Sequence, residues 1–147
     1  MNYILEEVSK IHNIHRLEKA IIEILNFDGW DLEWSGGGFD HYDAVGFTPK
    51  NIPCVIEMKF RKQYYYEKLL EKHKYDDLIY MPYDMAKFYF IADPKGNYLF
   101  WLNNLEMPEP VEILCPDTTF WEKKKVLKEC YLLPENDAVV INKNVDL

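Results

Sequence analysis

The chemistry in this sequence is concentrated on one short segment, Val55–Phe60. Successive side chains of a strand point to opposite faces, so Glu57 and Lys59 would share one face while the apolar residues between them share the other. Asp43 precedes Glu57 by 14 positions, in a second strand-like run, Tyr42–Phe47. Two carboxylates and a lysine that meet from neighbouring strands suit a divalent metal and an attacking water. This arrangement indicates hydrolysis of phosphodiesters.

Glu18 is a third candidate carboxylate, on the apolar stripe of a predicted helix. Ile14 lies one turn before it, and Ile21 one turn after it. A carboxylate that faces a core is costly unless it is paired or bound to a metal. The alternative is that Glu18 lies at the edge of the stripe and reaches solvent, and the sequence leaves both readings open.

Periodicity and turn residues predict the elements that must position these groups. The expected helices and strands, in chain order, are a helix over Ile11–Phe27, strands over Trp30–Trp34, Tyr42–Thr48 and Cys54–Phe60, a helix over Tyr64–Tyr80, a hairpin of Ala86–Ala92 and Tyr98–Leu102, a helix over Thr119–Tyr131, and a strand over Ala138–Ile141. The expected buried stripe of the first helix is Ile14, Leu17, Ile21, Ile22 and Leu25. The order predicts an α/β sandwich with helices packed on a central sheet.

Composition limits the class of protein. The 147 residues fit a single domain, with the C-terminal third, about 103–147, matching no pattern that we recognise. The chain has 17 Lys and Arg against 25 Asp and Glu, a formal net charge of −8. This balance opposes simple nucleic-acid binding, although bound divalent cations would offset part of the charge.

Cysteine spacing and the N-terminus indicate the compartment. Cys54, Cys115 and Cys130 are widely spaced, which argues against a disulfide framework or a zinc cluster and favours a reducing compartment. The first residues carry acids where a signal peptide would carry bases, and no apolar run approaches membrane-spanning length. We therefore expect a cytoplasmic protein without a membrane segment.

The spacing of Asp43 and Glu57-Met58-Lys59 resembles the core of the PD-(D/E)XK nuclease superfamily. Within it, the chain is similar to small members of the Holliday-junction-resolvase type. Their first helix carries a glutamate, here Glu18, and a Gly-aromatic pair, here Gly29-Trp30, precedes the first strand. The resemblance covers roughly Ile11 to Phe90. It implies a restriction-endonuclease-like fold, in which helices flank a mixed central sheet with an α-β-β-β-α-β core.

The resemblance also implies a metal-dependent DNA endonuclease of the resolvase, restriction or repair type. Asp43, Glu57, the backbone carbonyl of Met58 and Glu18 would bind Mg²⁺ or Mn²⁺, and Lys59 would orient the attacking water or offset charge on the phosphate. Two other classes remain: an inactive binding module that kept this fold, and an acidic inhibitor that mimics DNA. Many members of this fold act as dimers, so Trp101, Phe120 and Trp121 are candidates for a homodimer interface, or else they complete the core.

Contacts with nucleic acid would come from residues that follow the Glu57 strand. Arg61 shares the strand face of Glu57 and Lys59, and Gln63 follows closely. The predicted second helix presents Lys68, Lys72 and Tyr75 at helical spacing, as a stripe that could follow a phosphate backbone. The competing interpretation is a solvated helix face that also carries Glu67 and Glu71.

Overall fold

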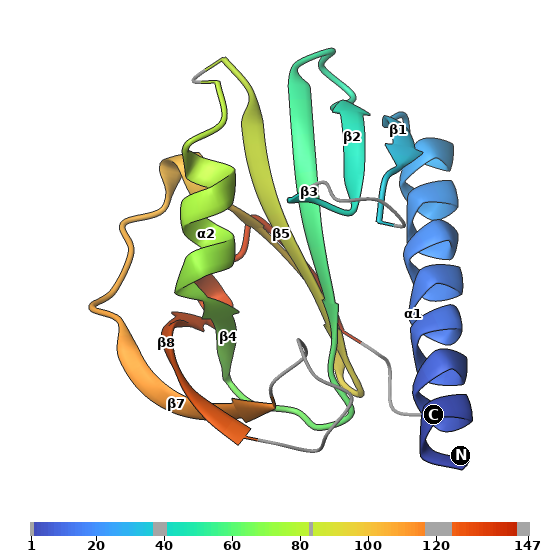
Figure 1. Ribbon diagram of the computed structural model, residues 1–147. Coiled ribbons are helices and arrows are strands. Elements are labelled where there is room, and N and C mark those ends of the chain that lie inside the picture. Colours follow the sequence, from blue (N-terminus) through green and yellow to red (C-terminus); the bar gives the residue numbers. More distant parts are fainter. Residues whose placement is uncertain (1, 37–40, 83, 117–124, 144–147) are drawn as a thin grey trace.

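The computed structural model describes residues 2–36, 41–82, 84–116 and 125–143. Figure 1 shows the elements in space. In chain order they are α1 (Asn2–Phe27), β1 (Asp31–Trp34), β2 (Ala44–Phe47), β3 (Pro53–Phe60), β4 (Glu67–Glu71), α2 (Lys72–Ile79), β5 (Ala86–Asp93), β6 (Gly96–Trp101), a 3₁₀ turn (Leu102–Asn104), β7 (Val111–Pro116), β8 (Lys125–Pro134), a second 3₁₀ turn (Glu135–Asp137) and β9 (Val140–Lys143).

A central mixed sheet has the strand order β1-β2-β3-β5-β6-β9. Strands β3 and β5 are parallel, and the other neighbours in this sheet pair antiparallel. Helix α1 lies on one face, while α2 and a small sheet of order β4-β8-β7 lie on the other (Figure 1). The predicted mixed sheet flanked by helices is therefore confirmed.

Alternation along β3 divides the interior into two cores, one on each face of the central sheet. Ile56 and Met58 pack with Ile22 of α1. Val55 points the other way and packs with Leu70 of β4 and Leu78 of α2. Glu57 belongs to this second face, so the strand that carries it has buried apolar neighbours on both sides.

The predicted helix over Tyr64–Tyr80 is wrong in its first half. Residues Glu67–Glu71 form β4, which pairs antiparallel with β8, and the helix begins only at Lys72. The segment is rich in good helix formers, but Lys68 and Leu70 are buried at the two-residue spacing of a strand. Pairing with a strand more than 50 residues away overrides the local preference.

The predicted helix over Thr119–Tyr131 is also wrong where the chain is described. Residues Lys125–Pro134 form β8, the middle strand of the small sheet. Cys130 and Leu133 are buried in it. Strand β8 supplies the hydrogen-bond partners that the backbone of β4 needs. Trp101 packs against the core of the α1 face, while Phe120 and Trp121 lie outside the described residues.

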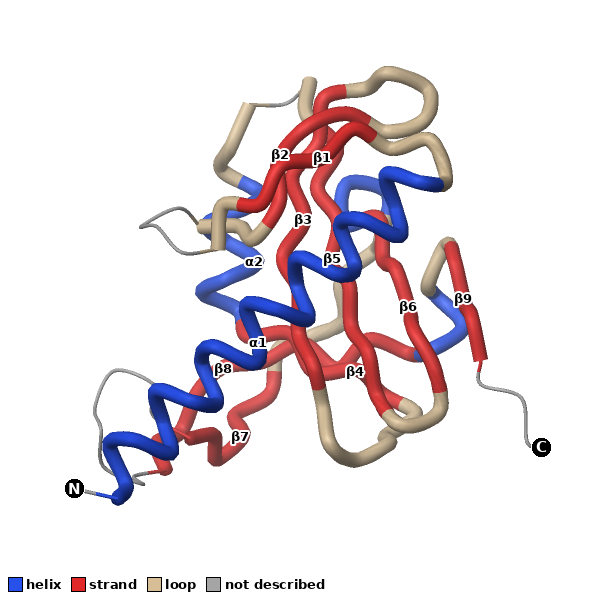
Figure 2. The backbone as a smooth tube through the Cα atoms, turned by 90° about the vertical axis from the view of Figure 1, so that its right-hand side faces the viewer, coloured by secondary structure: helices blue, strands red, loops and turns tan. Residues whose placement is uncertain are grey.

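Helix α1 is longer than predicted, and less of it is buried. Ile22 is buried and Ile21 and Leu25 pack against the same core, but Ile14 and Leu17 are 42% and 48% exposed. Figure 2 shows α1 running diagonally across the sheet. The buried part of the predicted stripe is therefore its C-terminal portion. No helix in the described parts of the chain is long and apolar enough to cross a membrane.

Candidate active site

The candidate site lies just before the start of β2, where β2 no longer pairs with the edge of β3. The β2–β3 ladder stops at Ala44 opposite Ile56. Asp43 still donates its backbone N–H to the Ile56 carbonyl, at 2.9 Å. Two residues further along β3, the Asp43 side chain replaces the backbone, because its Oδ2 accepts a hydrogen bond from the Met58 N–H at 2.8 Å. The Asp43 carboxylate is therefore held against the edge of the strand that carries Glu57.

Met58 also turns its carbonyl toward this edge. In a strand, the N–H and C=O of one residue point to the same side, and the Met58 N–H points at Asp43. No β2 residue pairs with Met58 in the described ladder. The carbonyl oxygen predicted from the sequence as a metal ligand thus faces the same place as the Asp43 carboxylate.

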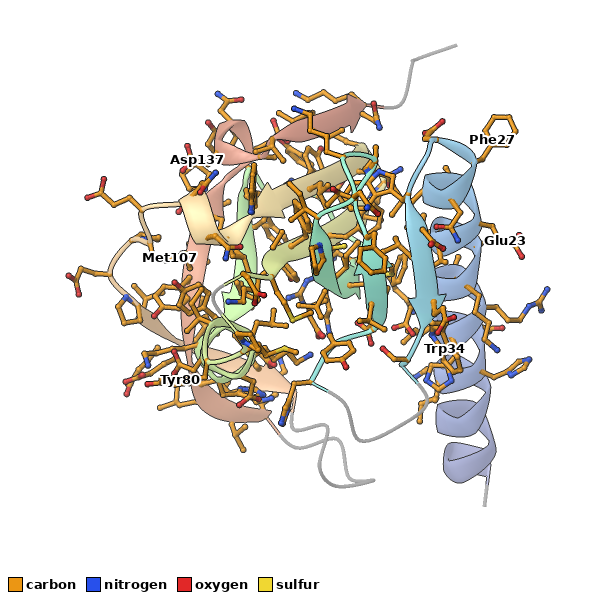
Figure 3. The ribbon with its side chains drawn as sticks, turned by 90° about the horizontal axis from the view of Figure 1, so that it is seen from above. Glu23, Phe27, Trp34, Tyr80, Met107 and Asp137 are labelled. Atoms are coloured by element: carbon orange, nitrogen blue, oxygen red, sulfur yellow. The ribbon has the colours of Figure 1, made fainter. Side chains whose placement is uncertain are left out.

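Glu18 reaches the site from α1, with a side chain that is only 4% exposed. The indole Nε1 of Trp34 donates to Glu18 Oε1 at 3.0 Å, and Figure 3 shows Trp34 lying against α1. Gly36 covers the two carboxylates: a Cβ there would lie 2.6 Å from Glu18 Oε1 and 3.1 Å from Asp43 Oδ1. The interpretation of Glu18 as a solvent-reaching edge residue is therefore wrong.

Burial and mutual repulsion shape the acidity of the three carboxyl groups. Burial, with the neighbouring Asp43 charge, raises the pKa of Glu57 to about 8. Burial is also the main reason that the pKa of Glu18 rises to about 7, where the Trp34 hydrogen bond opposes the shift and the Asp43 charge adds to it. The pKa of Asp43 is raised by burial too. Such raised values are typical of acids gathered in a functional site.

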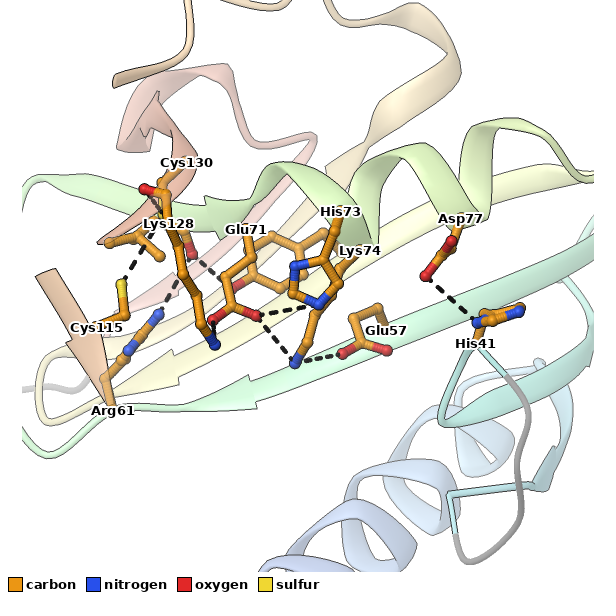
Figure 4. Close-up of polar contacts among 12 residues, drawn as sticks. His41, Glu57, Arg61, Glu71, His73, Lys74, Asp77, Cys115, Lys128 and Cys130 are labelled. Carbon is orange, nitrogen blue, oxygen red and sulfur yellow. Dashed lines mark hydrogen bonds and ion pairs between the residues drawn. The ribbon is translucent and has the colours of Figure 1, made fainter. Parts of the chain in front are cut away.

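Two lysines accompany these acids, and Lys74 is the nearer one. Its Nζ lies 3.3 Å from Glu57 Oε1 and 3.7 Å from Glu71 Oε2 (Figure 4). Lys59 forms no ion pair with any described residue, and burial together with the charge of Lys74 lowers its pKa to about 8. Lys59, Lys74 and Glu57 all line a small cavity of about 10 Å³.

The donor set suits a divalent metal, although the side chains are not arranged as a finished cage. No group of three or more His, Cys, Asp or Glu side chains is placed to hold a metal among the residues that the structure describes. Mg²⁺, however, is often bound by one or two carboxylates with water completing its shell. The acids here are buried and repel one another, and a divalent cation would relieve that repulsion.

The architecture is similar to that of a solved nuclease. The chain matches Hjc, a Holliday junction resolvase from the archaeal hyperthermophile Archaeoglobus fulgidus, with a TM-score of 0.57 over 87% of this chain and 88% of that chain. The chain therefore shares the fold of that resolvase, a mixed central sheet flanked by helices. The two sequences are 16% identical, so the likeness concerns the fold. No family model and no curated protein matches the sequence.

The residues predicted to contact nucleic acid are dispersed in the structure. Lys72 pairs with Asp76 on α2, at 2.8 Å, and Tyr75 of the same helix packs on Tyr131. Arg61 is half-buried and Gln63 is exposed beyond the end of β3. The predicted helical stripe of three residues therefore does not exist, because its first member belongs to β4.

Lys68, that first member, is buried rather than presented to solvent. Its side chain is 2% exposed, and its Nζ lies 2.9 Å from Asp93 Oδ2 and 3.5 Å from Glu135 Oε1. Lys68 is also close to the rings of Tyr64 and Tyr98. The prediction that it contacts a phosphate backbone is wrong, since the ammonium is enclosed with two carboxylates of its own.

Three residues of the candidate site were not predicted from the sequence: Trp34, Gly36 and Lys74. Trp34 ends a predicted strand, and Gly36 lies between predicted elements, so the sequence gives neither a partner. Lys74 lies in a predicted helix whose start was wrong by eight residues, so the direction of its side chain could not be inferred. The three consecutive glycines at 36–38 indicate a tight turn, but they do not indicate a contact with carboxylates.

Proposed function

We propose that this protein is a metal-dependent DNA endonuclease that hydrolyses phosphodiester bonds. The observation that carries the proposal is the close approach of three carboxyl groups: Glu18 of α1, Asp43 just before β2, and Glu57 of β3. The nuclease fold supports the same reaction class. The Holliday junction resolvase activity of Hjc belongs to that protein and supports DNA as the substrate here.

Asp43 and Glu57, with the Met58 carbonyl, would hold Mg²⁺ or Mn²⁺, and Glu18 would complete the site. When bound, the metal lowers the pKa of water and offsets negative charge on the phosphate. The carboxylates keep the ion at the edge of β3, because Asp43 is fixed by the Met58 N–H and Glu18 by the Trp34 indole. Gly36 leaves room for both carboxylates.

Lys59 would supply positive charge beside the scissile phosphate. It is half-buried on the face of β3 that carries Glu57, and a pKa of about 8 leaves the ammonium as the major form at pH 7. A buried cation stabilises charge that develops on a phosphate more strongly than an exposed one. In-line attack by water would leave a 5′-phosphate. Arg61, Gln63, Lys72 and Tyr75 remain candidates for contacts with DNA outside the site.

A cleavage assay tests the proposal. The protein is incubated with supercoiled plasmid, linear duplex, single strands and a four-way junction, in Mg²⁺, Mn²⁺ or EDTA. We expect cutting only with the metals, and a loss of about a hundredfold or more in the Lys59→Ala variant. Lys62→Ala is the matched control, because Lys62 is exposed just beyond the same strand.

Each of the other outcomes would favour a different function for this protein. Cutting that persists in EDTA, or that Lys59→Ala leaves intact, contradicts the proposed site. DNA binding without cutting favours the inactive binding module. An absence of binding even at low salt favours the acidic inhibitor, for which the net charge of −8 would be the relevant feature.

A further inference from the structure

Lys74 occupies a place in this site that the sequence assigned to Lys59. It projects from α2 between Glu57 and Glu71, with its Nζ 3.3 Å from the first carboxylate and 3.7 Å from the second (Figure 4). Its side chain is 35% exposed, so the ammonium is reachable from solvent. The charge that balances Glu57 in the metal-free protein therefore comes from helix α2.

The two carboxylates that Lys74 contacts are held differently. Glu71 has a second partner, because Lys128 of β8 binds its Oε1 at 2.9 Å. Among the described residues, Glu57 forms an ion pair only with Lys74. If Lys74 withdrew, Glu71 would keep its ion pair with Lys128, and Glu57 would have no ion pair among the described residues. Glu57 is thus the carboxylate whose charge depends on Lys74.

A divalent ion bound by Glu57 would compete with the Lys74 ammonium for the negative charge of that carboxylate. Mg²⁺ coordinates carboxylate oxygens at about 2.0–2.1 Å, and a fixed positive charge within a few ångströms of it is strongly repelled at a partly buried position. Glu71 offers Lys74 another partner on the same helix end, one residue before α2 begins. The lysine can therefore release Glu57 without losing every carboxylate contact.

We propose that the Lys74 ammonium is an internal counter-cation for the carboxylate site, which a divalent metal displaces from Glu57 toward Glu71. The inference depends on the proposed metal site and extends it, since it assigns the metal-free state its own cation. Lys74 is then a positioning residue that sets metal affinity. It holds Glu57 in place when no metal is present, and it competes with the metal for that carboxylate.

The direct test measures Mn²⁺ binding at pH 7 by electron paramagnetic resonance and by calorimetry. We expect the Lys74→Met variant to bind Mn²⁺ about tenfold more tightly than the wild type, because a competing charge has been removed. In EDTA the same variant should melt at a lower temperature, and Mn²⁺ should raise its Tm by more than it raises that of the wild type. A merely structural role predicts weaker Mn²⁺ binding, not tighter.

Lys128→Met is the matched control, because Lys128 pairs with Glu71 and makes no ion pair with Glu57. Its Mn²⁺ affinity should stay within about twofold of the wild type, since its charge lies beyond the carboxylates that would hold the ion. Equal affinities for wild type and Lys74→Met would overturn the role of Lys74 and leave the nuclease proposal standing. If neither protein binds Mn²⁺, the metal site itself is wrong.

A measurement on the wild-type protein keeps the inference testable if Lys74→Met does not fold. Lysine acetylation by a small anhydride is followed by mass spectrometry, in EDTA and in Mg²⁺. Release from Glu57 should make Lys74 react several-fold faster in Mg²⁺ relative to Lys72, whose partner Asp76 lies outside the site. An unchanged ratio of the two rates would overturn the displacement.

Discussion

At the scale of single residues, the site depends on the packing that fixes each carboxylate. Asp43 completes a backbone ladder with its side chain, and Glu18 accepts from an indole. Both contacts hold the carboxylate in a partly buried place where its charge is expensive. A functional site can maintain such strained electrostatics because the two cores beside β3 keep the surrounding elements in position.

Gly36→Ala tests the closeness of Glu18 and Asp43. The added Cβ would lie 2.6 Å from Glu18 Oε1 and 2.9 Å from Trp34 Nε1, so the glutamate must move. Because that carboxylate ends a flexible side chain, we expect a change in unfolding free energy of under about 1 kcal/mol with a several-fold loss of Mn²⁺ affinity. Urea titration and calorimetry measure the two quantities. Unchanged Mn²⁺ affinity would remove Glu18 from the metal site.

The metal-free protein should lose stability as pH rises from about 5 to 8. The folded-state pKa values of Glu18 and Glu57, about 7 and about 8, lie above the 4.5 of an unperturbed glutamate. In that window the folded state binds more protons than the unfolded state, so the free energy of unfolding falls with increasing pH. Lys59 acts oppositely above pH 8, because its lowered pKa makes stability recover toward pH 10.

Urea titrations in EDTA at several pH values measure this dependence. The Glu18→Gln variant keeps the shape of the side chain and an acceptor for Trp34, but it does not titrate. Between pH 5 and 7, the free energy of unfolding of this variant should fall less steeply than that of the wild type. Superimposable profiles for the two proteins would mean that Glu18 has an ordinary pKa.

At the scale of elements, the small sheet places α2 against the site. Strand β4 leads directly into α2. Every residue of β4 pairs with a residue of β8. Leu70 of β4 and Leu133 of β8 are buried with Leu78 of α2 in one core. The position of Lys74 beside Glu57 therefore depends on strands that are remote from it in the sequence.

Leu133→Ala tests this support. Leu133 is fully buried, so we expect a loss of about 2–5 kcal/mol in the free energy of unfolding. Leu127→Ala on the same strand is the control, since Leu127 is 66% exposed and its loss should be within about 0.5 kcal/mol. Urea unfolding measures both values. A loss for Leu133→Ala no larger than the control would show that the small sheet adds little to stability.

At the scale of the whole molecule, the net charge of −8 opposes contact with a polyanion. Long-range repulsion from DNA is not offset by the few basic residues near the site, one of which, Lys68, is enclosed. Divalent cations would supply positive charge where the substrate approaches. The affinity for DNA should therefore depend on the metal rather than on a basic surface.

Fluorescence anisotropy with labelled duplex and four-way DNA measures this dependence at about 150 mM salt. We expect weak binding in EDTA and binding at least about tenfold tighter in Ca²⁺, an oxygen-seeking cation of the same charge as Mg²⁺. The Asp43→Asn variant should lose that gain. Equally tight DNA binding in EDTA and in Ca²⁺ would show that surface residues of the protein, and not the metal, bind the DNA.

Several elements of the molecule could be predicted from the sequence. The strands carrying Asp43 and Glu57, the turn between them and the hairpin of β5 and β6 follow from two-residue alternation and turn residues, which act over a few positions. These elements depend on neighbours in the chain, so the chain alone determines them. For Glu18 the sequence left an inward and a solvent-reaching interpretation open, and only its burial in the structure decided between them.

The tertiary structure decided the rest, for a physical reason that is the same in each case. Lys68 lies in a strand, and Lys74 lies beside Glu57, because β8 pairs with β4 from across the sequence. Burial of Ile22 but not of Leu17 depends on where α1 crosses the sheet. Long-range pairing and burial outweigh local preference, and neither can be computed from spacing along one segment.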